Sequence, residues 1–144
     1  MYVSLTVEVA VSAERLWAQL ADIPSHTEWM RDAREIEVTS DRKQGAGTTA
    51  RVRTRIGPLR TRDEMRFTVW KPPELMGVEH IGAVTGTGLF RIEPTGEGAC
   101  TFTWEEELHF PWWLGGPLGE LVGRPVVKAV WRRNLDRLVA LAAR

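Results

Sequence analysis

The stretch from residue 102 to residue 110 constrains the fold of this chain more than any other. Its even-numbered positions hold Phe102, Trp104, Glu106, Leu108 and Phe110, and alternation with period two is typical of a strand with one buried face. Glu106 shares that apolar face. A buried carboxylate is costly unless it is paired, solvated or protonated. The pattern therefore indicates a wet or ligand-filled cavity rather than a dry core.

Length and composition predict one domain, residues 1–144, with a substantial core. The formal net charge is zero, so no overall field would attract nucleic acid or an anionic membrane. Cys100 is the only cysteine, so an intrachain disulfide is excluded, which suits a reducing cytoplasm. The simplest interpretation of Cys100 is a buried, inert thiol. The N-terminus lacks a signal-peptide pattern, and no apolar run reaches the roughly 18 residues of a membrane helix. We therefore expect a cytoplasmic protein without stable membrane insertion.

The order of predicted elements defines the fold class. Alternation predicts strands at 3–9, 36–38, 48–56, 59–70, 75–81, 85–93 and 99–110. Ser12 is placed to cap a first helix, and a second short helix is expected to start at Ser25 or Thr27. Apolar residues recur at helical spacing between Leu118 and Ala142 and predict a long helix. Pro125 is expected either to kink this helix or to lie in the first turn of its second part. This order predicts an antiparallel sheet that buries one face against the terminal helix.

A turn at Gly57-Pro58 should join strands 48–56 and 59–70 as a hairpin. A two-residue turn sets the register and places Val52 opposite Asp63 on the inner face. The outer face would then carry a cluster of like charges, which destabilise a strand pair when they lie directly opposite each other. Neutralisation by nearby acids such as Glu64 and Glu79 is one interpretation, and an anionic partner or a dimer contact is the other. The cluster consists of Arg53, Arg55, Arg60 and Arg62.

Six stretches carry a resemblance to a known superfamily. They are Val11–Trp17, Ile23–Met30, Gly45–Thr48, Trp70–Pro73, Phe90–Pro94 and Thr101–Trp104. Together with the element order, they make the chain resemble the START-like superfamily, also called SRPBCC or pollen-allergen-like, and most of all its polyketide cyclase/dehydrase group. The resemblance implies an α+β helix-grip fold. In that fold a seven-stranded antiparallel curved sheet carries two short helices after its first strand, and a long C-terminal helix packs across it over an apolar cavity.

Alternation places three ionisable side chains, Asp63, His80 and Glu106, on the concave face of the sheet. A small core seldom tolerates three unpaired ionisable groups. In an enzyme they would be the catalytic residues, with His80 as the base and a carboxyl group of raised pKa as the acid. A register error of one residue would instead turn each of them to solvent. His26 and His109 are expected on the surface.

Large apolar residues make up the rest of the expected pocket, with plain core packing as their alternative explanation. Trp112 and Trp113 lie among glycines and prolines between the last strand and the helix. They are predicted to form a hinged lid, with contact to a membrane interface or a second subunit as alternatives. The expected ligand-binding residues are Trp29, Met65, Phe67, Met76, Val78, Phe90, Ile92, Phe102, Trp104, Trp131 and Leu135.

Two functions fit these patterns. The first is binding of a small hydrophobic ligand, lipid-, polyketide- or isoprenoid-like, as a carrier or sensor. The second is a polyketide aromatase/cyclase or dehydratase that uses acid and base residues in the same cavity. A partner-binding module that uses the outer sheet is a third option. No metal-ligand spacing, phosphate loop or nucleophile elbow is present, so no metal or cofactor is expected. Nucleic acid is not expected either, because the net charge is zero and no aromatic stacking platform accompanies the arginine cluster. A homodimer stays open.

Overall fold

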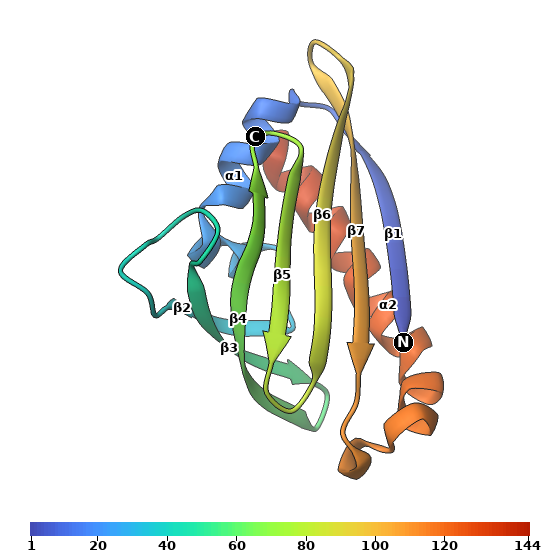
Figure 1. Ribbon diagram of the computed structural model, residues 1–144. Helices are drawn as coiled ribbons and strands as arrows, with labels where there is room; N and C mark the ends of the chain where they lie inside the picture. Colours follow the sequence, from blue (N-terminus) through green and yellow to red (C-terminus); the bar gives the residue numbers. More distant parts are fainter.

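The computed structural model describes residues 1–144 as a seven-stranded antiparallel sheet with one long helix (Figure 1). The strands follow the spatial order β1-β7-β6-β5-β4-β3-β2. Their bounds are β1 (Tyr2–Val9), β2 (Ala33–Val38), β3 (Thr49–Ile56), β4 (Leu59–Lys71), β5 (Leu75–Ile81), β6 (Thr85–Gly96) and β7 (Ala99–His109). The helices are α1 (Ala13–Ala21), η1 (Ile23–Glu28), η2 (Trp112–Leu114) and α2 (Gly116–Ala142). This architecture confirms the predicted α+β helix-grip arrangement.

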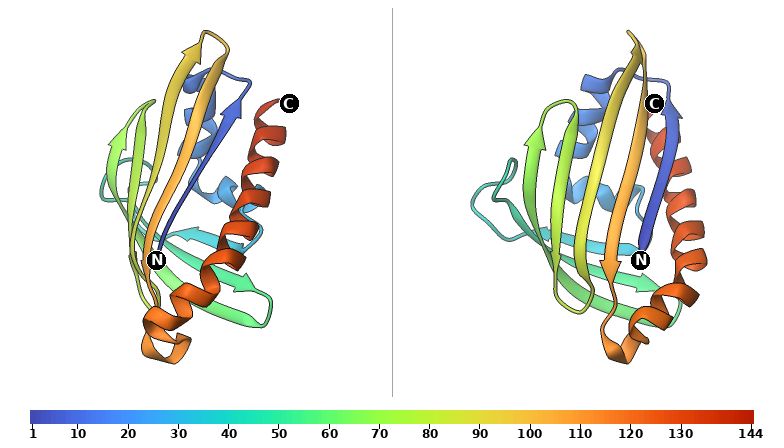
Figure 2. Two further views of the ribbon diagram at one scale, coloured as in Figure 1. Left: turned by 90° about the vertical axis from the view of Figure 1, so that its right-hand side faces the viewer. Right: turned by 45° about the vertical axis from the view of Figure 1, so that its right-hand side comes forward.

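Helix α2 lies along the concave side of the curved sheet (Figure 2). Its apolar stripe explains this position, because Val127, Trp131, Leu135, Leu138 and Ala142 recur at helical spacing and are all buried. Pro125 lies inside this one helix, whose axis changes direction in its orange N-terminal part (Figure 2). A bend near a proline is expected, since proline lacks an N–H and clashes with the preceding turn. No helix of the structure combines the length and the apolar character needed to cross a membrane.

The two short helices obey local capping chemistry. The Ser12 hydroxyl accepts a hydrogen bond from the Arg15 N–H at 3.2 Å, as predicted for the start of α1. The second helix, η1, begins at Ile23 and thus earlier than expected, because Pro24 in its first turn favours a helix start rather than a break. Helix α1 lies at one end of the sheet and contacts β6, whereas η1 contacts β2 (Figure 1).

The register of the β3–β4 hairpin is the predicted one. Val52 pairs with Asp63, and on the outer face Arg53 lies opposite Arg62. Arg53 is neutralised by Glu35 at 2.8 Å, an acid on β2 that the hairpin pattern alone does not reveal. The acids named from the sequence pair elsewhere, with Glu64 3.9 Å from Arg51 and Glu79 2.7 Å from Arg66. These exposed pairs contribute little stability each, about 0–1 kcal/mol.

Candidate functional site

A cavity of about 190 Å³ lies between the concave face of the sheet and helix α2. Of the residues that line it, most are apolar. Ten predicted site residues are among them: Asp63, Met65, Phe67, Met76, Val78, His80, Phe90, Trp104, Glu106 and Trp131. The sheet therefore brings together side chains from four of its strands, β4 to β7, on one concave wall.

Four other predicted ligand-binding residues do not line the cavity. Trp29, Ile92, Phe102 and Leu135 are almost completely buried in the core behind or beside it. All four belong to the continuous hydrophobic core, together with side chains of α1 and α2 such as Leu16 and Leu138. Alternation identifies the inward face but does not distinguish its solid part from its hollow part.

His80 and Glu106 form an ion pair inside the cavity. The Nε2 atom of His80 lies 2.8 Å from Oε2 of Glu106, and the Trp104 indole N–H donates to Oε1 at 3.0 Å. Glu106 is buried, and His80 is mostly so. The carboxylate noticed in the sequence is therefore paired, and each of its oxygens has a donor, which offsets much of the cost of its burial.

Glycines on the intervening strand β6 make room for this pair. Gly86 lies opposite His80 on β5, and Gly88 lies opposite Glu106 on β7. A Cβ atom on Gly88 would lie 2.5 Å from both carboxylate oxygens of Glu106. Asp63 has a similar arrangement, since a Cβ on Gly82 would lie 2.4 Å from its Oδ1 atom. Gly88 and Gly82 therefore mark the close approach of acidic side chains, whereas Gly86 marks the close approach of the β7 backbone at Glu107.

The ion pair decides the charge of His80. Burial works to lower the pKa of His80, but the hydrogen bond and charge of Glu106, together with the charge of Asp63, raise it above its ordinary value. The pair therefore favours the protonated form of the imidazole next to a carboxylate. This favours His80 as an acid rather than the base expected from the sequence.

The raised pKa of His80 predicts a pH-dependent stability. The pKa of His80 is higher in the folded protein than in the unfolded chain, so protonation of this side chain stabilises the fold. This stabilisation is fully present below about pH 6.5, the ordinary pKa of histidine, and is lost as the pH rises through the pKa of His80 in the folded protein. We expect Glu106→Gln to remove this decline, measured by urea unfolding between about pH 6 and about pH 9. Glu107→Gln is the matched control, because Glu107 lies beside the exposed His109 at 4.0 Å. An unchanged decline in Glu106→Gln would show that the pair is not its source.

A second polar cluster lies on the opposite wall, and sequence reasoning missed it. Asp32 lines the cavity and accepts hydrogen bonds from Asn134 Nδ2 at 2.6 Å and from Trp131 Nε1 at 3.3 Å. The Trp131 ring stacks on Trp104, with ring centroids 4.5 Å apart. Asn134 could have been found, because it lies three residues after Trp131 on the buried stripe of α2. Asp32 precedes β2 and follows no periodicity.

The expectation of an exposed His26 is wrong. His26 is buried and lines the cavity, between the rings of Trp29 and Phe90 at centroid distances of 5.6 and 5.9 Å. Its Nε2 atom lies 2.7 Å from the Leu20 carbonyl and so must carry the proton. Burial lowers the pKa of His26, so it is a neutral side chain whose Nδ1 is left as an acceptor. His109 is exposed, as predicted.

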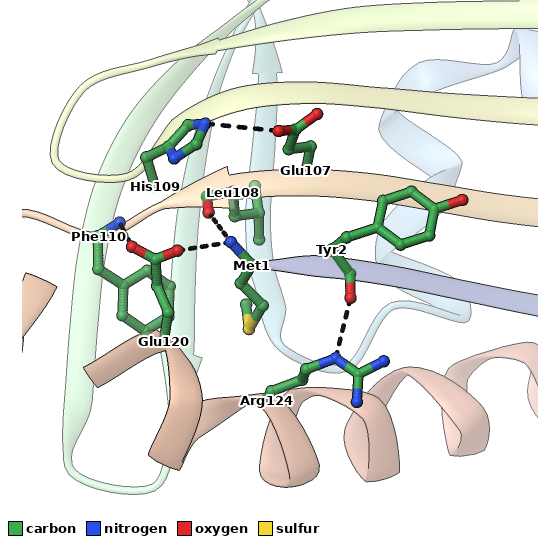
Figure 3. Close-up of polar contacts among 8 residues, drawn as sticks. All are labelled: Met1, Tyr2, Glu107, Leu108, His109, Phe110, Glu120 and Arg124. Carbon is green, nitrogen blue, oxygen red and sulfur yellow. Dashed lines mark hydrogen bonds and ion pairs between the residues drawn. The ribbon is translucent and has the colours of Figure 1, made fainter. Parts of the chain in front are cut away.

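The start of α2 is anchored to the sheet edge (Figure 3). Glu120 accepts the Phe110 N–H at 3.2 Å and lies 2.5 Å from the Met1 ammonium, which also donates to the Leu108 carbonyl at 2.7 Å. The hydrogen bond from Met1, followed by that from Phe110, lowers the pKa of Glu120. Arg124 donates to the Tyr2 carbonyl at 2.9 Å. These contacts hold both ends of the η2 segment.

The predicted lid residues lie outside the cavity. Trp112 and Trp113 are 87% and 53% exposed, whereas their neighbours Phe110 and Leu114 line the cavity. Exposed apolar side chains continue along the first turns of α2 at Leu118, Leu121, Val122 and Val126. In this conformation the two tryptophans therefore do not close the mouth.

The cavity between a curved sheet and its C-terminal helix defines the protein as a helix-grip protein. The sequence pattern of the family described as "Polyketide cyclase / dehydrase and lipid transport" matches residues 2–143, so the chain belongs to this family. Membership supports a ligand-binding or cyclase-type function in general terms. No curated protein matches the chain.

Solved structures with low sequence identity share the fold. The Zhui aromatase/cyclase from a Streptomyces species is 17% identical, with 100% of this chain and 94% of that chain covered at a TM-score of 0.79. Norcoclaurine synthase from Thalictrum flavum, in complex with dopamine and hydroxybenzaldehyde, is 18% identical, with 99% and 86% covered at 0.73. A protein from Geobacillus kaustophilus is 14% identical, with 99% and 95% covered at 0.81. At these identities the similarity concerns the fold.

Proposed function

We propose that the chain binds a small hydrophobic ligand in its cavity, as a carrier or sensor. The observation that supports this proposal is the cavity itself, whose walls combine apolar side chains with a few polar groups at fixed positions. A lipid-, polyketide- or isoprenoid-like molecule would satisfy such walls. The unpaired, buried Cys100 suits a reducing cytoplasm as the place of action.

Native mass spectrometry of the protein purified from its own cells tests this function. We expect a retained apolar molecule that organic extraction releases. The variant Met65→Trp is the matched control, because position 65 lines the cavity and a larger side chain would fill it. A folded wild-type protein that retains nothing, and gains no thermal stability from any apolar probe, would contradict the proposal.

The His80–Glu106 pair supports an enzyme as the second candidate. In an aldol-type cyclisation, a carboxylate such as Asp63 would take a carbon-bound proton next to a ketone, and the resulting enolate would form a carbon–carbon bond to a second carbonyl carbon. The His80 imidazolium would give its proton to the new alkoxide, and the proton on the carboxyl group would then restore the imidazolium. Loss of the hydroxyl as water would complete a dehydration.

Turnover of a linear poly-β-ketone thioester distinguishes the enzyme from the carrier. We expect Asp63→Asn, His80→Ala and Glu106→Gln each to lower kcat by about a hundredfold or more if the protein is an enzyme. Affinity for a non-reactive analogue should change much less in the same variants. No turnover in the wild type while the analogue binds would leave only the carrier. Turnover that survives in all three variants would exclude these side chains as the catalytic groups.

A lid formed by Trp112 and Trp113 stays a proposal about ligand exchange. Because Glu120 holds both ends of the segment, a closing movement would be confined to the residues between Phe110 and Gly116. We expect the double change Trp112→Ala and Trp113→Ala to speed the release of a fluorescent apolar probe several-fold, measured by stopped-flow. Unchanged affinity and unchanged release rate would exclude the lid, and an altered oligomeric state would favour a subunit contact instead.

A further inference from the structure

We propose that the cavity selects an apolar ligand that carries a protonated amine and rejects ligands that carry a carboxylate or phosphate. This inference rests on the proposed function and adds the charge of the ligand to it. It comes from the charged groups that line the cavity, among which acids outnumber bases.

Acidic groups outnumber basic ones on this wall. The cavity is lined by three carboxylates, Asp32, Asp63 and Glu106, and by no lysine or arginine. Its two histidines are His80, which pairs with Glu106, and His26, which is neutral in its buried position. Even with His80 fully charged, three negative charges face one positive charge. The formal charge of the lining residues is therefore minus two.

The partners of the two remaining carboxylates are neutral. Asp32 receives hydrogen bonds only from the Asn134 amide and the Trp131 indole. Asp63 receives one from the backbone N–H of Ala83 at 2.8 Å. No lysine or arginine lies within salt-bridge distance of these acids, although other acids of the chain have such partners. Neutral donors orient the carboxylates but leave their charge in place.

The guanidinium groups of Arg137 and Arg55 donate to neutral oxygens and not to Asp32. Arg137 donates to Oδ1 of Asn134 at 3.0 Å, so this amide separates it from Asp32. Arg31 reaches the same oxygen with its backbone N–H. The Arg55 backbone N–H donates to the Asp32 carbonyl, while its guanidinium donates to the Gly57 carbonyl. The charge of Asp63 acts on His80, whereas Asp32 has only neutral side-chain donors, so Asp32 is the proposed anchor of the ammonium group.

The surroundings of Asp32 suit an ammonium group on an apolar skeleton. The stacked rings of Trp104 and Trp131 lie beside Asp32. Aromatic faces attract cations, and they also pack well against the apolar part of a ligand. A charge in such a partly dry site is screened less than at the surface, so an opposite charge is attracted and a like charge is repelled strongly. A fatty acid or an acyl phosphate would bring a further negative charge into this field.

Three probes on one aromatic skeleton test the inference: naphthalene-methylamine, naphthalene-methanol and naphthoate. Isothermal titration calorimetry at neutral pH should give an amine affinity about tenfold above that of the alcohol, and little or no binding of naphthoate. Asp32→Asn should remove most of the preference for the amine and leave the alcohol unchanged. Glu97→Gln, in the exposed turn between β6 and β7, is the matched control and should change nothing. Met65→Trp should abolish binding of all three if they occupy the cavity.

The outcomes separate this inference from the proposed function. Binding of the alcohol with no gain for the amine, or tighter binding of naphthoate, would overturn the charge selection and leave the cavity as a binding site. An amine preference that persists in Asp32→Asn but is lost in Asp63→Asn would overturn Asp32 as the anchor. Failure of all three probes to bind would count against the proposed function and the inference together.

Discussion

We expect Phe102→Ala to destabilise the protein by about 3–5 kcal/mol, the largest loss predicted for any substitution discussed above. Phe102 is completely buried, lies in the core behind the cavity, and contacts the ring of Phe90 at a centroid distance of 5.2 Å. Its removal would leave a new void that the surrounding sheet and helix cannot fill. Urea unfolding at constant pH measures the change in the free energy of unfolding.

Phe90→Ala is the matched comparison for this prediction. Phe90 is the same residue type in contact with Phe102, but it lines the cavity and is not fully buried. Its removal would enlarge an existing space rather than create one, so we expect no more than about half the loss. Equal losses for the two variants would mean that the cavity is filled in solution, by collapse of its walls or by a bound molecule.

We expect Gly88→Ala to break the polar pair in the cavity. The added Cβ would lie 2.5 Å from both oxygens of Glu106, so the carboxylate would have to leave the position in which it contacts Trp104 and His80. Displacement of the carboxylate should cost about 1–3 kcal/mol and lower the pKa of His80 towards its ordinary value. Urea unfolding and an NMR titration of the His80 ring protons measure the two effects.

Gly96→Ala is the control on the same strand, because nothing lies within 4 Å of its added Cβ. It should change the free energy of unfolding by less than about 0.5 kcal/mol and leave the pKa of His80 as it is. A Gly88→Ala protein with the wild-type titration of His80 would show that Glu106 has room to move, and that the glycine serves another purpose.

The sequence predicted most of the sheet because alternation reports burial strand by strand. The hairpin register between Val52 and Asp63 followed from one turn, and the inward position of Glu106 followed from the apolar residues on either side of it. The buried stripe of α2 was equally readable from its spacing. In each of these cases the signal is local, since side-chain direction repeats along a single element.

Contacts between distant elements were not readable in this way. His26 was expected on the surface, yet η1 turns it into the cavity, where its partner is the Leu20 carbonyl. Asp32 was not predicted as a site residue. Its hydrogen-bond donors, Asn134 and Trp131, are about a hundred residues away in sequence and come close only when α2 packs on the sheet. Three inward residues, Ile92, Phe102 and Leu135, are part of the continuous core and do not line the cavity, a distinction that depends on how the elements pack.

The sequence by itself determined which side chains face inward, including the acid among the aromatics at position 106. The tertiary structure alone decided that His80 lies beside this acid, that Gly88 leaves space for both, and that Asp32 lies on the opposite wall. The physical reason is that burial follows from the period of each strand and helix, whereas charge pairing depends on distances between elements. Those distances are set only when the sheet curves and the helix closes over it.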